Sequence, residues 1–163
     1  MNTEKQYISS KLLFNAIEET LSKNKMATFT VTGMSMWPFL CHGRDQVIVK
    51  ACKSKEIKKG DIVLIKTILD TYLLHRVTNI TPEGFETTGD GNCFRDGIFS
   101  SKYVIAKVEF LVYKSRKIDC NSFFYRFIVN LWMFLFPIRK LLLKTLKIYS
   151  KFKHLFMFNK KRL

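Results

Sequence analysis

The chain has 163 residues, a length that suits one compact domain with an appendage and excludes a two-domain enzyme with a large cofactor fold. Hydrophobic residues make up 47% and charged residues 25%, which is typical of a globular protein and excludes general disorder. The formal net charge of +15 predicts contact with an anionic surface.

The N-terminal residues 1–26 carry the first predicted element. Between Glu4 and Ser22 apolar side chains recur at helical spacing with polar residues between them, which predicts one amphipathic helix. This segment lacks the apolar core of a secretory signal, so we expect the cysteines to be reduced. Their positions show no metal-ligand spacing, so no metal and no cofactor is expected: Cys41, Cys52, Cys93 and Cys120.

Residues 27–120 read as a mainly β domain. Short runs rich in β-branched and aromatic residues are separated by turns containing Gly, Asp, Asn and Pro. Without alternating helices, such runs favour an antiparallel sheet over a parallel one. The expected strands are 27–32, 46–50, 61–66, 72–80, 85–88 and 103–113.

The last 43 residues, 121–163, form a basic and aromatic segment that we call the tail. It holds 10 basic residues and no acidic one, whereas residues 1–120 hold 18 basic and 13 acidic residues. The longest uncharged run, 127–138, is shorter than the roughly 20 apolar residues that a membrane-spanning helix needs. We therefore expect a helical tail that associates with an anionic membrane surface without spanning it.

Three features of the β domain carry groups suited to catalysis. Ser35 follows the first strand in a turn that begins at Gly33, where backbone N–H groups can point at a substrate carbonyl. His75 interrupts an apolar strand, and Asp90 and Asp96 lie in one turn-rich loop. Taken singly, each has an ordinary alternative reading as a turn serine, a structural histidine or a pair of turn aspartates.

Their order along the chain resembles a known family. Five motifs between Thr28 and Val108 are similar to those of the type I signal peptidases and their relatives, the self-cleaving repressor proteases. The motifs are Gly33-Met34-Ser35-Met36-Trp37-Pro38-Phe39-Leu40, Asp45-Gln46-Val47-Ile48-Val49, Gly60-Asp61-Ile62-Val63, Leu74-His75-Arg76-Val77 and Thr87-Thr88-Gly89-Asp90-Gly91-Asn92 followed by Asp96.

This resemblance implies a signal-peptidase-like antiparallel β domain and assigns roles to the candidate residues. Typical bacterial members carry a lysine base where this chain has His75, so the chain resembles the endoplasmic-reticulum and sporulation type. In that type the resemblance implies Ser35 as nucleophile, His75 as general base and acid, and Asp96 as its orienting group. Asp90 and Gly33 are then supporting residues, although either aspartate could orient the histidine.

The leading hypothesis is a serine endopeptidase that cleaves a signal or leader peptide at a membrane, with its catalytic domain on the cytoplasmic side. Its partners would be a peptide or preprotein substrate and an anionic membrane bound through 121–163. One alternative is a catalytically idle peptidase fold that serves as a regulatory or binding module. Another is a basic nucleic-acid-binding protein, which is less favoured because the tail is too apolar for a solvated nucleic-acid arm.

Overall fold

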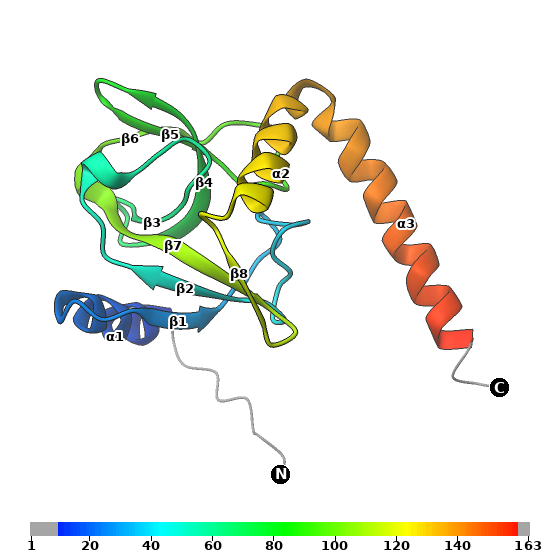
Figure 1. The fold of residues 1–163 in the computed structure, drawn as a ribbon, viewed down its shortest axis with the longest axis horizontal. Helices are drawn as coiled ribbons and strands as arrows, with labels where there is room; N and C mark the ends of the chain where they lie inside the picture. The colour runs from blue at the N-terminus through cyan, green and yellow to red at the C-terminus, as the bar shows by residue number, and fades with distance from the viewer. Residues whose placement is uncertain (1–9, 160–163) are drawn as a thin grey trace, which may run out of the picture.

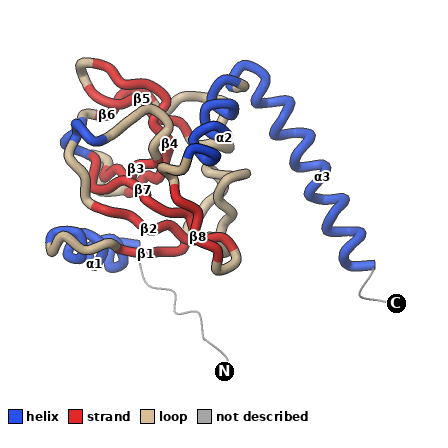
Figure 2. Tube along the Cα trace, viewed as in Figure 1, coloured by secondary structure: helices blue, strands red, loops and turns tan. Residues whose placement is uncertain are grey.

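The computed structural model describes residues 10–159, and the expected helix residues 4–9 and tail residues 160–163 lie outside that range. Within it the chain forms an antiparallel sheet with helices at both ends of the sequence (Figures 1 and 2). The elements are α1 (Ser10–Ser22), β1 (Ala27–Thr30), β2 (Gln46–Lys50), η1 (Ser54–Glu56), β3 (Ile62–Lys66), β4 (Tyr72–Thr81), β5 (Gly84–Thr88), β6 (Gly97–Phe99), η2 (Ser101–Tyr103), β7 (Val104–Tyr113), β8 (Arg116–Asp119), α2 (Phe123–Phe134), η3 (Phe136–Ile138) and α3 (Arg139–Asn159).

All strand pairs described are antiparallel, which confirms the expected mainly β class. The strand order is β1-β2-β7-β3-β4-β5-β6, and β8 adds to β7. The long β7 holds the sheet together because it pairs with β2 and β3 and, near its end, with β8. Figure 1 shows the sheet curling around itself, with α1 alongside β1 and α2 across the opposite end.

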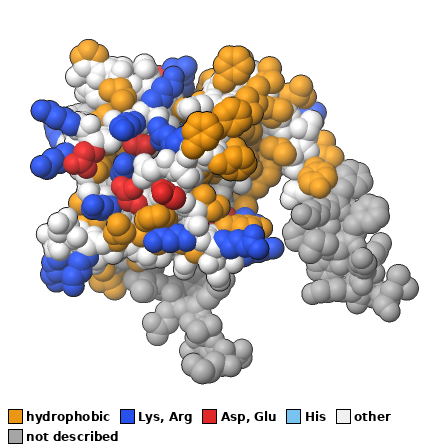
Figure 3. All heavy atoms as spheres, viewed as in Figure 1, with side chains coloured by type: hydrophobic (Ala, Val, Ile, Leu, Met, Phe, Trp, Pro, Cys, Tyr) orange, Lys and Arg blue, Asp and Glu red, His pale blue; other side chains and the backbone are white. Residues whose placement is uncertain are grey.

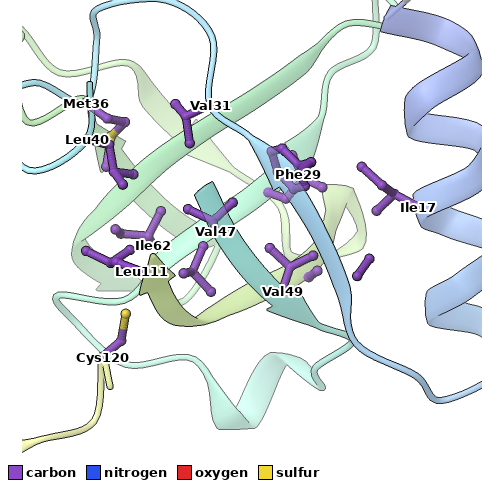
Figure 4. Packing of buried hydrophobic residues seen from close by; sticks show 14 of the residues in the cluster. Ile17, Phe29, Val31, Met36, Leu40, Val47, Val49, Ile62, Leu111 and Cys120 are labelled. Atoms are coloured by element: carbon purple, nitrogen blue, oxygen red, sulfur yellow. The ribbon is translucent and has the colours of Figure 1, made fainter. Parts of the chain in front are cut away.

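Hydrophobic residues pack on both faces of the curled sheet. Ile62 and Leu64 of β3 join one cluster, whereas Val63 and Ile65 join the other, so this strand is buried on both sides. That explains its continuous apolar run. Figure 4 shows Ile17 of α1 lying against β1 beside Phe29, so the amphipathic helix covers one edge of the larger cluster.

The tail begins with a helix that packs on the β domain. Tyr125 and Val129 of α2 are buried in the larger cluster, although the expected domain boundary falls before them, after Cys120. After η3 the chain turns, and α3 leads away from the sheet (Figure 1). None of the helices within residues 10–159 has both the length and the apolar content needed to cross a membrane.

Candidate active site

The serine lies in the turn that follows β1. Ser35 is half-buried and contributes to the lining of a cavity of about 500 Å³ together with residues of α1, β1 and β4. Two residues earlier, Gly33 has a φ of +83°, a conformation that L side chains rarely adopt. Its backbone N–H donates to His42 Nδ1 at 3.0 Å, which ties the turn to the chain beyond it.

The histidine is held in place by a carboxylate. His75 lies on β4 with 3% of its surface exposed, and its Nδ1 is 2.6 Å from Asp96 Oδ2. The same oxygen accepts a hydrogen bond from the Thr87 hydroxyl at 2.9 Å, and the Asp96 N–H donates to the Thr87 carbonyl. Because an ionised carboxylate only accepts, the neutral imidazole carries its proton on Nδ1 and presents Nε2 as an acceptor.

Serine and histidine approach one another at Gly89. A Cβ added to Gly89 would lie 2.5 Å from the Ser35 carbonyl oxygen and 3.0 Å from His75 Nε2. His75 Nε2 is buried, and within the described residues it has no hydrogen-bond partner, Ser35 included. Catalytic hydrogen bonds are often unformed in a free enzyme and tighten when substrate binds. The Ser35 main chain and the His75 imidazole therefore both lie close to Gly89.

The second aspartate has a different partner. Asp90 receives two hydrogen bonds from Arg76, at 2.8 Å from Nε and 2.7 Å from Nη2, and both side chains are 1% exposed. Burial opposes the charge on Arg76, but the interactions with Asp90 and Tyr125 together raise the pKa of the guanidinium above its ordinary value. Of the two aspartates, Asp96 therefore contacts the histidine and Asp90 the arginine.

Both glycines that flank Asp90 lie against the serine turn. The Gly91 N–H donates to the Ser35 carbonyl at 2.7 Å. A Cβ at Gly91 would lie 2.8 Å from the Met34 carbonyl oxygen, which is closer than a real Cβ atom can approach without a shift of the backbone. The loop 89–92 therefore needs glycine at these two positions in order to lie directly on the serine turn.

Three tail residues hold this part of the molecule, a role that the sequence analysis missed. The Tyr125 hydroxyl lies 3.4 Å from the Arg76 guanidinium, and Trp132 Nε1 donates to the Asp90 carbonyl at 3.3 Å. Arg139 Nη1 lies 3.4 Å from the Gly89 carbonyl oxygen. The inner face of the tail is thus part of the candidate site's support.

Two of the four cysteines are poorly suited to replace Ser35 as nucleophiles. All four are free, and burial raises the pKa of both Cys52 and Cys120 to about 11, which keeps these thiols protonated near neutral pH. Among residues 10–159, no group of three or more His, Cys, Asp or Glu side chains is arranged to hold a metal ion.

A comparison with known proteins found no family model and no curated protein that matches the chain. The resemblance to the signal peptidases therefore rests on the five motifs alone. What the geometry adds is independent of family: Asp96 is bonded to His75 Nδ1, and the Ser35 carbonyl oxygen and His75 Nε2 both lie close to Gly89.

We expect Asp96→Asn to lower kcat by about 10²- to 10⁴-fold in a peptide-cleavage assay. The amide can turn its NH₂ toward His75, which favours the tautomer with the proton on Nε2, and that tautomer cannot accept a proton from serine. Thermal unfolding should change little because the two side chains have the same shape. Asp119→Asn, an isosteric change at the exposed end of β8, is the matched control, and equal losses in both variants would contradict a special role for Asp96.

Proposed function

We propose that the protein is a serine endopeptidase that cleaves a signal or leader-like peptide, with Ser35 as nucleophile, His75 as general base and Asp96 as the orienting carboxylate. One observation carries the proposal. Asp96 holds Nδ1 of a buried histidine while Nε2, without a partner among the described residues, lies next to the serine turn. A purely structural histidine is expected to have both nitrogens satisfied when it is this deeply buried.

The proposed reaction follows from these positions. As Ser35 Oγ attacks the scissile carbonyl carbon, its proton passes to His75 Nε2, and Asp96 stabilises the resulting imidazolium. The backbone N–H of Ser35 is the expected donor to the developing oxyanion. The C–N bond then breaks, the leaving amine takes the proton from Nε2, and water hydrolyses the acyl-serine by the same route.

The cavity beside Ser35 supports a peptide substrate. Its walls include Phe29 from β1, Val31 just after that strand, and Leu73 and Leu74 from β4, so apolar surface lines the same cavity as the serine. An extended segment with apolar side chains near the scissile bond would bury them there, and apolar burial contributes roughly 25 cal/mol per Å². Leader and signal segments have this composition, which supports that substrate class.

The test is a search for cleavage with the full chain. Wild-type protein and Ser35→Ala are incubated with a diverse peptide library, and new peptide termini are mapped by mass spectrometry. We expect termini that appear only with the wild type and share apolar residues before the cut. If the two proteins give the same termini, the peptidase proposal is wrong and the catalytically idle fold becomes the better reading.

We further propose that the tail docks on an anionic membrane and that the catalytic domain lies on the cytoplasmic side. The outer face of α2 exposes Phe123, Phe124 and Phe127, of which Phe123 is 87% exposed. Figure 3 shows hydrophobic side chains gathered in this region of the surface. Aromatic residues favour the interface of a bilayer, and nearby Lys and Arg side chains each contribute about 1 kcal/mol at an anionic surface.

We expect the full chain to bind vesicles that contain anionic lipid about tenfold or more strongly than vesicles of neutral lipid. Replacing Phe123, Phe124 and Phe127 together by serine should weaken binding by about tenfold or more in a co-sedimentation assay. The matched control is Ile68→Ser with Leu69→Ser, two apolar side chains that are equally exposed between β3 and β4.

Measurements with added salt and with nucleic acid can contradict the membrane proposal. Binding to anionic vesicles should weaken as ionic strength rises because exposed charges are screened over about 8–10 Å at physiological salt. If a single-stranded oligonucleotide bound more tightly than the vesicles, or if the Ile68 and Leu69 control lost as much vesicle binding as the phenylalanine variant, the membrane proposal would be wrong.

A further inference from the structure

Arg139, at the start of α3, is a buried cation. It is 2% exposed, and within the described residues it forms no ion pair and its Nε has no hydrogen-bond partner. Its guanidinium lies 5.2 Å from the ring centre of Trp132 and 4.8 Å from that of Phe136. Burial of a cation in this way costs folding free energy unless the contacts of the cation offset its lost hydration.

The contacts that Arg139 does make converge on one loop. Its Nη1 lies 3.4 Å from the carbonyl oxygens of both Gly89 and Asn92, and its Nη2 donates to the Trp132 carbonyl at 3.3 Å. Trp132 in turn donates from Nε1 to the Asp90 carbonyl. The tail therefore contacts three of the four carbonyls of the loop 89–92.

The loop 89–92 lies against both the serine turn and the histidine. A Cβ added to Gly89 would lie within 3.0 Å of both the Ser35 carbonyl oxygen and His75 Nε2, and the Gly91 N–H donates to the same Ser35 carbonyl. A displacement of the loop would carry the serine turn with it or leave that turn unsupported. Misplacement of catalytic groups by about 1 Å can cost about 10²-fold in rate.

We propose that Arg139 and Trp132 are positioning residues that fix the loop 89–92 and, through it, the separation of Ser35 and His75. The effect of these two residues on catalysis rests on the proposed peptidase function. A planar guanidinium can reach two carbonyls while stacking on two rings, whereas an ammonium is a point charge on a flexible stem. Lysine at position 139 should therefore replace arginine poorly.

The first test measures the loop without reference to catalysis. Hydrogen exchange of the Gly91 amide is followed by NMR in the full chain, with the sheet amides of Leu64 and Ala106 as internal references. We expect Arg139→Met to speed Gly91 exchange by about tenfold or more relative to those references. Trp132→Phe, which removes the indole donor and reduces the ring that lies against Arg139, should have a smaller effect in the same direction. It covers the case in which Arg139→Met fails to fold.

Arg126→Met is the matched control. Arg126 also lies in the tail, but its guanidinium donates to Asp61 Oδ1 and to the Lys59 carbonyl, both at 2.7 Å. Neither of these partners belongs to the loop 89–92. Gly91 exchange in this variant should stay near the wild-type rate. Equal acceleration in the Arg126 and Arg139 variants, or unchanged exchange in both Arg139→Met and Trp132→Phe, would overturn the proposal.

The second test uses the cleavage assay. Arg139→Met and Arg139→Lys should lower kcat by about tenfold or more and leave KM within about threefold, because the geometry of the reacting groups changes while the cavity that takes the peptide is intact. A rise in KM with unchanged kcat would contradict positioning. If the wild type cleaved no peptide, the proposed function would fail, and the exchange measurement would still decide whether the tail positions the loop.

Discussion

Ser35→Ala and His75→Ala are each expected to lower kcat for peptide cleavage by about 10³-fold or more. Alanine at position 35 removes the attacking oxygen, and alanine at position 75 leaves a serine hydroxyl that ionises far too weakly to attack a peptide at neutral pH. The two residues act in one step, so the double variant should be hardly worse than either single variant. Single-turnover cleavage of one mapped peptide measures all three.

Folding must be checked separately because the two changes differ in burial. Ser35 lies in a half-exposed turn, and its loss should leave thermal unfolding nearly unchanged. His75 is buried, so its loss opens space and leaves Asp96 without its partner, which should lower the free energy of unfolding by about 1–3 kcal/mol. Ser54→Ala, on an exposed short helix, is the matched serine control. Additive losses in the double variant would mean that Ser35 and His75 do not act together.

The strands of this protein could be predicted from residue patterns where burial is regular. Each expected strand is present with its ends within two residues, and β2 has the expected bounds Gln46–Lys50. β6 and β8 were missed for two reasons. β6 is three residues long, and all four residues of β8 are exposed, so neither shows alternation between buried and exposed side chains. Their pairing depends on neighbours supplied by β5 and β7.

For the candidate site, the sequence indicated the residues but not all of their contacts. Motif order singled out Ser35, His75 and both aspartates, but spacing could not say which aspartate serves the histidine. The sheet decides it. His75 and Arg76 are neighbours on β4 and so point to opposite faces, and Asp96 meets the first while Asp90 meets the second.

The contribution of the tail was the hardest part to predict. Tyr125, Val129 and Trp132 recur at the spacing of one helix face, which indicates that this face packs on something. Nothing in that spacing identifies the loop 89–92, about forty residues earlier in the chain, as the partner. The burial of Arg139 could not be predicted from the sequence, because a basic residue in a basic segment is expected to be exposed to solvent.

Asp90→Asn is expected to give the largest loss of stability among the site variants, about 3 kcal/mol in the free energy of unfolding. The change leaves Arg76 charged and buried with its two carboxylate hydrogen bonds replaced by weaker ones, and both side chains are 1% exposed, so water cannot compensate. The same arginine also donates to the Gly60 carbonyl at 2.7 Å, which means that its displacement disturbs the chain before β3 as well.

Denaturant unfolding of the full chain measures this loss against two comparisons. Glu86→Gln weakens the ion pair with Arg95, whose side chain is 55% exposed, and should cost less than about 1 kcal/mol because water screens that pair. Replacing both buried partners, with Arg76→Met and Asp90→Leu, should recover part of the stability lost in Asp90→Asn, since a buried pair removed whole leaves no charge unpaired. If Asp90→Asn proved as stable as the wild type while losing cleavage, Asp90 would have to act on His75 during the reaction. The roles assigned to the two aspartates would then have to be exchanged.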